Sequence, residues 1–291
     1  YAADALISTH VQPAAPDKVI YFRLAQHGLH ARGRQVYLKH GIINNAMDWL
    51  HYGSLYIDLF VCGAKPEYDH VRSTFGFPEG VVRYLGLCRY DSLQEPGSGE
   101  RMILLMPTWR SWLEGQNDEL FCQSSYYRHY TSLLNDQELL DYLKEKQIRL
   151  VFYIHPKLQE FIGTFHSEDS QIELYSFDSV PLNQLIMHCS MMITDYSSAC
   201  WDAYYQGKPI LFYQFDLDQY NKTNGSYIDM ETELWGDRCA EQAELIQLIK
   251  KYAENGFQEK AEYAEMRKNY FAYIDHNNCQ RTYEYIKSQG Y

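Results

Sequence analysis

The sequence predicts an α/β fold in which two Rossmann-like halves, each with a doubly wound parallel sheet, face each other across a cleft. Apolar runs of strand length alternate with helical patterns along most of the 291 residues. These runs are nearly continuous, as in strands that are covered on both faces. A segment rich in Pro and Gly interrupts the alternation near residue 95. The chain is long enough for two domains.

The first half contains four apolar runs, and each ends in small or polar residues. They lie at 4–9, 35–41, 57–64 and 81–87. Val, Ile, Leu, Tyr and Phe dominate them, which favours strands. The segment DSLQEPGSGE, residues 91–100, follows as a linker with one Pro, two Gly and two Ser. We therefore predict a first domain over residues 1–95 and a second over residues 96–291.

The second half repeats the pattern and then becomes helical. Its strand-like runs lie at 101–107, 148–156, 172–177, 190–196 and 208–214. Helical patterns, with apolar residues at three- and four-residue spacing, lie at 130–147 and 180–190. From about residue 240 the tail is helical, and its first helix ends at Gly256. In such a sheet, ligands bind outside the carboxyl ends of the strands.

Composition limits the classes of partner. The net charge of −12 excludes broad electrostatic binding of nucleic acid. Seven scattered cysteines without a CxxC pair indicate reduced thiols in the cytoplasm. We find no apolar run of ~20 residues and no signal peptide pattern. Because the first residue is Tyr, not Met, we expect residues to precede it, and a membrane-binding segment could lie among them.

Two histidines follow predicted strands, one in each half. His40 comes at the end of the 35–41 run, and His155 at the end of the 148–156 run. Taken alone, His40 could simply be satisfied by backbone at a strand end. Together, we expect the two imidazoles to point into the cleft, where they could transfer protons or pair with a phosphate as a cation.

The segment ITDYSSACWD, residues 193–202, predicts a phosphate site. Ser197 and Ser198 are good N-cap residues between a strand end and a helix that ends near Gly207. Such a helix start offers free N–H groups, a positive dipole end and two hydroxyls. The alternative is a plain N-cap, although the doubled serine with Asp202 one turn later is less common.

Two further segments end strands with polar residues. In LMPTWR, Pro107 stops the strand. Thr108 can donate a hydrogen bond to a phosphate, and Trp109 can pack beside a base or ribose. For Arg110 we expect no more than a structural role, bracing the loop. In LGLCRYD, the guanidinium of Arg89 either forms a surface ion pair or binds a diphosphate in a bidentate manner. The sequence has no Walker loop, GxGxxG, HExxH or DxD motif, so we predict neither a metal ion nor a cofactor.

Taken in order, these segments resemble the CDP-glycerol glycerophosphotransferase family, which includes teichoic acid primases and polymerases and relatives in capsule gene clusters. The resemblance runs from about residue 35 to 240 and rests on KHGI with LFVCGAKPEY, LGLCRYD, MPTWR, YIHPKL, ITDYSSACWD and GKPILFYQFDLDQY. It implies a GT-B-like fold closed by C-terminal helices, acting peripherally at the inner face of the cell membrane. A polyol-phosphate unit would pass from a CDP-polyol donor to a hydroxyl of a lipid-linked glycan or polyol-phosphate acceptor, with release of CMP.

The resemblance also implies roles for residues. His40 would be the catalytic base, and His155 would contact the donor diphosphate and assist departure of CMP. The remaining substrate contacts would be Gly41, Ile42, Ile43, Asn44, Arg89, Thr108, Trp109, Tyr153, Ile154, Ser197, Ser198 and Asp202. The segments KHGIINN and KTNGSYID depart from the family pattern in loops near the substrate, which leaves the identities of donor polyol and acceptor open.

Two other functions fit the same motifs. A GT-B glycosyltransferase with a nucleotide-sugar donor would use the helix start for its diphosphate but attack at a sugar carbon. A scaffold without catalytic activity, part of an envelope-polymer complex, is the third hypothesis. The presence of two histidines and two serines at strand ends favours an enzyme.

Overall fold

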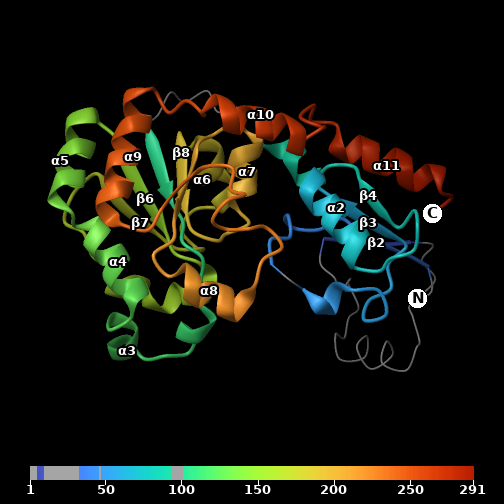
Figure 1. Ribbon diagram of the computed structural model, residues 1–291, viewed down its shortest axis with the longest axis horizontal. Coiled ribbons are helices and arrows are strands. Elements are labelled where there is room, and N and C mark those ends of the chain that lie inside the picture. The colour runs from blue at the N-terminus through green and yellow to red at the C-terminus, as the bar shows by residue number, and fades with distance from the viewer. Residues whose placement is uncertain (1–4, 10–32, 46, 94–100) are drawn as a thin grey trace. The chain divides into compact units, whose positions relative to one another are not determined.

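The computed structural model describes residues 5–9, 33–45, 47–93 and 101–291, and it divides into two compact units (Figure 1). The first unit comprises residues 1–93 and 268–291, and the second comprises residues 94–267. We describe each unit by itself. Most of the predicted linker, residues 94–100, lies outside the described residues.

The first unit is built on a four-stranded parallel sheet. Its strands follow in chain order: β1 (Ala5–Ser8), β2 (Arg34–Tyr37), β3 (Leu59–Cys62) and β4 (Val82–Tyr84). Helix α2 (Lys65–Thr74) leads into Phe75, which meets Phe60 on one face of the sheet. Helix α11 (Asn278–Ser288) packs Tyr285 and Ile286 against the other face. Short 3-10 turns lie at η1 (Asp48–Leu50) and η2 (Cys88–Ser92).

The structure differs from the predicted domain limits at the C-terminal end, because α11 packs in the first unit. The carboxylate of Asp91 accepts hydrogen bonds from the backbone N–H groups of Asn278 and Cys279, at 2.9 and 2.7 Å, and so caps this helix. Gly86, at φ +82°, leaves room for the side chain of Asn278. The sequence of α11 shows that it is amphipathic, but it does not show which sheet covers its apolar face.

The second unit contains a six-stranded parallel sheet in the order β10-β9-β8-β5-β6-β7. Its strands are β5 (Met102–Leu105), β6 (Arg149–Tyr153), β7 (Ile172–Tyr175), β8 (Met191–Thr194), β9 (Ile210–Tyr213) and β10 (Asp237–Cys239). With β5 as strand 1, this is the 3-2-1-4-5-6 order of the Rossmann fold. The prediction of a doubly wound parallel sheet is confirmed for this unit, whereas the described strands of the first unit are parallel but follow in chain order. From β5 the chain adds strands on one side, β6 and β7, and then returns to add β8, β9 and β10 on the other side. The carboxyl ends of β5 and β8 therefore form the switch point where ligands bind in this fold.

Helices cover both faces of this sheet (Figure 1). On one face lie α3 (Asp118–Cys122), α4 (Ser125–Leu134), α5 (Gln137–Lys146), η4 (Pro156–Thr164) and α9 (Gln242–Glu254). Helices α6 (Leu182–His188) and α7 (Cys200–Tyr205) lie on the other face, and η3 (Ser111–Leu113), α8 (Leu217–Asn224) and α10 (Ala261–Tyr270) complete the chain. Every residue of β5, β8 and β9 is buried, as near-continuous apolar runs predict.

Two helix predictions need correction. The pattern at 130–147 forms two helices. Asp136 is the N-cap of the second helix, α5, because its side chain accepts a hydrogen bond from the N–H of Leu139 at 3.0 Å. The helix after the doubled serine begins only at Cys200, with Ala199 as its N-cap. Among the described residues, no helix is both long enough and apolar enough to cross a bilayer.

Candidate active site

One carboxylate joins the two turns at the switch point of the second unit. Asp195 follows β8, and its Oδ1 accepts the backbone N–H of Thr108, after β5, at 2.8 Å and that of Tyr196 at 2.6 Å. The side chain of Asp195 is fully buried. A carboxylate that accepts two backbone N–H groups holds those groups in a fixed geometry. The MPTWR and TDYSS segments are therefore held together by this carboxylate.

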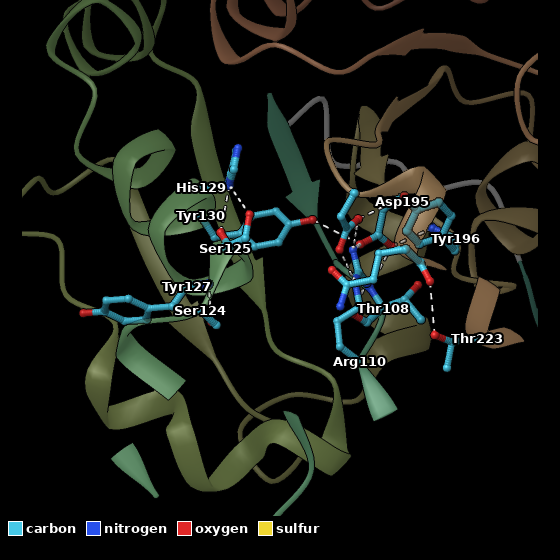
Figure 2. A network of polar contacts seen from close by, with 12 residues as sticks. Thr108, Arg110, Ser124, Ser125, Tyr127, His129, Tyr130, Asp195, Tyr196 and Thr223 are labelled. Carbon is cyan, nitrogen blue, oxygen red and sulfur yellow. Dashed lines mark hydrogen bonds and ion pairs between the residues drawn. The ribbon is translucent and has the colours of Figure 1, made fainter. Parts of the chain in front are cut away.

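The buried Arg110 guanidinium holds this carboxylate from the other side. It forms an ion pair with Asp195 Oδ2 at 2.9 Å, and it donates hydrogen bonds to Asp216 Oδ2 and to the Thr108 carbonyl, both at 2.7 Å. Figure 2 shows Arg110, Asp195 and Tyr130 pointing toward one another, and the Tyr130 hydroxyl donates to Asp195 Oδ2 at 3.1 Å. Burial disfavours the charge on Arg110, but the carboxylates of Asp195 and Asp216 outweigh this and raise its pKa. Arg110 braces both turns, as its sequence position suggested.

The braced turns present hydroxyl groups. Thr108 Oγ1 is buried and has no hydrogen-bond partner among the described residues. Ser197 is almost buried, and its Oγ accepts the N–H of Ala199 at 3.2 Å, which leaves its proton available for donation. Ser198 is half-buried. The two serines of the predicted phosphate site thus lie in the turn between β8 and α7.

His155 lies beside Trp109, in the turn after β5, as a neutral imidazole. Its ring centre is 6.2 Å from that of Trp109, and its Nδ1 accepts the N–H of Lys157 at 3.2 Å. The proton therefore sits on Nε2. Burial, reinforced by the nearby Lys157 ammonium, lowers the pKa of His155 to about 4. At neutral pH the ring can donate a hydrogen bond but does not carry the positive charge that one of its predicted roles required.

The ammonium of Lys157 adds positive charge next to His155. It lies 4.1 Å from the centre of the Trp109 ring and 3.1 Å from a carboxylate oxygen of Glu114. Tyr153, the last residue of β6, and Ile154, which follows it, are buried, so their predicted substrate contact would be made through backbone. Asp202 is also buried, within α7.

In the first unit, a buried ion pair holds the turn that contains His40. Lys39 has φ +66°, a conformation that is strained for a side-chain-bearing residue, and its ammonium contacts the Glu67 carboxylate. Glu67 also accepts the N–H groups of Ile43 at 2.6 Å and Gly63 at 2.8 Å. Both charged side chains are buried. The pair thus ties the loop after His40 to the end of β3 and to α2.

His40 itself is exposed at the end of this rigid turn, with its Nδ1 3.3 Å from the Thr9 carbonyl. The following residues Ile42, Ile43 and Asn44 are buried, and Gly41 is half-buried, so this loop is well packed. The Arg89 guanidinium lies close enough to add to the effect of burial and lower the pKa of Lys39. Arg89 and the His40 turn are therefore neighbours within the first unit.

Sequence reasoning missed the residues that hold these turns. Lys39, Glu67, Tyr130 and Asp216 were not singled out, although all four bond to the turns. The available signal was the presence of acids within the apolar segments AKPEY and FDLDQY. Within the described chain, no group of three or more His, Cys, Asp or Glu side chains could hold a metal ion.

Comparison with known proteins gives consistent results. The family model described as CDP-Glycerol:Poly(glycerophosphate) glycerophosphotransferase matches residues 89–288. The minor teichoic acid biosynthesis protein GgaB of Bacillus subtilis is 30% identical over 262 residues, which cover 86% of this chain and 29% of that protein. A teichoic acid poly(ribitol-phosphate) polymerase of Bacillus spizizenii is 29% identical over 157 residues, which cover 54% of this chain and 23% of that protein.

Solved structures support the fold. The wall teichoic acid polymerase TagF superimposes with a TM-score of 0.62 at 18% identity, over 89% of this chain and 69% of that one. Together with the two parallel sheets, this likeness shows a GT-B-like fold. The chain spans less than a third of the length of either curated relative.

Proposed function

Because the chain belongs to the CDP-glycerol:poly(glycerophosphate) glycerophosphotransferase family, we propose that it transfers a polyol-phosphate unit from a CDP-activated donor to a hydroxyl of a lipid-linked acceptor. The product would be a teichoic acid or capsular polymer, and CMP would be released. The two named relatives are teichoic acid proteins, and one of them is a poly(ribitol-phosphate) polymerase, which keeps glycerol and ribitol both open as the polyol.

The observation that carries the proposal is the pair of turns joined by Asp195. They stand at the carboxyl ends of β5 and β8, where a Rossmann sheet binds nucleotides. They carry the hydroxyls of Thr108, Ser197 and Ser198, with a neutral His155 nearby. Neutral donors of this kind suit a diphosphate in a protein whose net charge is −12.

In the proposed reaction, the acceptor oxygen attacks the phosphorus that carries the polyol. His40 takes the acceptor proton as the new O–P bond forms, which makes a hydroxyl a usable nucleophile at neutral pH. The bond from this phosphorus to the bridging oxygen of the diphosphate breaks, and its electron pair leaves with CMP. The reaction requires the His40 turn and the donor turns to act on the same phosphorus, as the sequence predicts.

The role of His155 follows from its pKa. As a neutral ring at pH 7, it would donate from Nε2 to a diphosphate oxygen, and the growing negative charge on CMP would strengthen this bond in the transition state. The ammonium of Lys157, which is paired with Glu114, lies next to it. Arg89, on the other unit, is the proposed second cation for the diphosphate.

The acceptor and the location are proposed from the family resemblance. A lipid-linked glycan or polyol phosphate would supply the hydroxyl, and the protein would act at the inner face of the cell membrane. The alternative, a glycosyltransferase with a nucleotide-sugar donor, shares the fold and the diphosphate site but differs in the atom attacked.

The test is donor selectivity in a CMP release assay. CDP-glycerol, CDP-ribitol, UDP-sugars and GDP-sugars are incubated with the protein and a lipid-linked acceptor analogue, and released nucleotide is measured. We expect CMP from one of the CDP-polyols only when the acceptor is present. Release of UDP or GDP with a nucleotide sugar, and none of CMP, would establish the glycosyltransferase instead.

A further inference from the structure

The first unit contains a pocket far from the predicted reacting groups. It has a volume of about 470 Å³, within the range of roughly 300–1,000 Å³ that is usual for small-molecule sites. It lies at the amino ends of the strands, where Arg34 begins β2 and Arg83 lies in β4. His40 follows the carboxyl end of β2, so the pocket and the candidate base lie at opposite ends of the strands of one sheet.

One of the two arginines in this pocket, Arg83, is held in place without an ion pair to any described residue. The Nε of Arg83 donates to the Tyr285 hydroxyl at 2.8 Å, and its guanidinium lies 5.3 Å from the Tyr285 ring centre. No carboxylate in the described part of the chain forms an ion pair with Arg83. By contrast, the other arginine of the pocket, Arg34, is paired with Asp58 at 2.8 Å. The terminal N–H groups of Arg83 are therefore available to an anion.

The other walls suit a hydroxyl-rich chain. Tyr52 and Tyr56 are 46% and 42% exposed, with ring centres 5.4 Å apart, so they offer aromatic faces to carbon-bound hydrogens. Glu79 is exposed and forms no ion pair with any described residue, which makes it an acceptor for hydroxyl groups. Its negative charge would also weaken binding of a bare inorganic anion.

We propose that this pocket binds a polyol phosphodiester unit of the polymer chain, away from the reacting end. Arg83 would contact the phosphate, Glu79 the polyol hydroxyls, and the tyrosine rings the carbon chain. This inference rests on the proposed function for its choice of polymer. A site of this kind keeps an acceptor chain near the enzyme by multivalent attachment, since the reacting end and a distant unit are held together.

The test is calorimetric titration with a synthetic glycerol-phosphate trimer that carries no nucleotide. We expect the trimer to bind, and Arg83→Gln and Tyr52→Ala each to weaken its binding at least fivefold. Arg72→Gln is a matched control, because Arg72 also lies over a tyrosine, 5.8 Å from the Tyr68 ring, but does not line the pocket. Tyr283→Ala is the control for Tyr52→Ala, since Tyr283 is 59% exposed outside the pocket. Both controls should bind the trimer like the parent protein.

Further titrations separate this proposal from others. CDP-glycerol should bind all these variants equally, so failure of CDP-glycerol to bind would count against the proposed function and not against the pocket. Inorganic phosphate should bind at least tenfold more weakly than the trimer. Phosphatidylglycerol vesicles present the same phosphodiester as a lipid headgroup. Trimer binding that is absent, or unaffected by Arg83→Gln and Tyr52→Ala, would overturn the proposal, as would Arg83-dependent binding to the vesicles alone.

Discussion

Buried ion pairs brace turns in both units, but the histidines at or beside these turns lie in different environments. In the first unit, the Lys39–Glu67 pair fixes the turn, and His40 stands exposed at its end. In the second unit, Arg110 and its carboxylates fix the turns, and the adjacent His155 is desolvated enough to lower its pKa to about 4. A histidine that is to accept a proton needs access to solvent and substrate, whereas one that is to donate a hydrogen bond to a diphosphate need not be charged. On this difference we propose His40, rather than His155, as the base.

The largest expected effect is on turnover, through His40. His40→Ala should lower turnover ~100- to 10,000-fold at saturating donor and acceptor, because a positioned general base contributes about that much. Donor affinity should be nearly intact. His155→Ala should weaken donor binding as well. The measurement is CMP release under saturating conditions together with calorimetric donor titration, and near-normal turnover of His40→Ala would remove it from the role of base.

The next effect is on stability and compares the two braces. Arg110→Met and Lys39→Met should each lower the free energy of unfolding by about 3 to 5 kcal/mol, because each leaves a buried carboxylate without its cation. Lys65→Met is the control, since its pair with Asp69 is exposed on α2. It should unfold almost like the parent protein. Urea titrations measure all three, and equal midpoints for Arg110→Met and Lys65→Met would show that the brace is not structural.

The lowered pKa of His155 predicts a pH-dependent loss of stability. The unfolded chain binds a proton at this ring near pH 6.5, and the folded chain only near pH 4, so stability is present above pH 6.5 and is lost as the pH falls toward 4. The contribution should be about 2 kcal/mol, after allowance for the partial exposure of the ring.

His155→Asn tests this, since its side-chain oxygen can still accept the N–H of Lys157. The difference in unfolding free energy between pH 7 and pH 4.5 should be smaller in the variant than in the parent protein. An identical difference in both would mean that the folded ring titrates normally.

The smallest expected effect is the loss of one hydroxyl at the donor turns. Ser198→Ala should weaken CDP-polyol binding by about 1 to 2 kcal/mol, which lies between the usual values for a neutral hydrogen bond and for one to a charged group. Ser288→Ala is a matched control in the first unit, where the serine hydroxyl bonds to Tyr285 and Gln289 at the end of α11. Calorimetric titration should separate the two, and equal donor affinity would exclude Ser198 from the site.

The sequence predicted the strands well, because burial on both faces leaves nearly continuous apolar runs, as in Met102–Leu105. It missed β10, Asp237–Cys239, which is a short strand at the edge of its sheet with two charged residues. The turns at Thr108 and Ser197 could be predicted from strand-end chemistry. Their brace could not, because the bonds of Arg110 to Asp195 and Asp216 join residues far apart in the chain.

The most direct test of the central claim is a crystal structure of the protein with CDP-glycerol bound. The account predicts the diphosphate within hydrogen-bond distance of Ser197, Ser198 and Thr108 Oγ1, with Nε2 of His155 donating to it. A nucleotide bound elsewhere, with these hydroxyls unoccupied, would contradict the assignment of the donor site to the turns after β5 and β8.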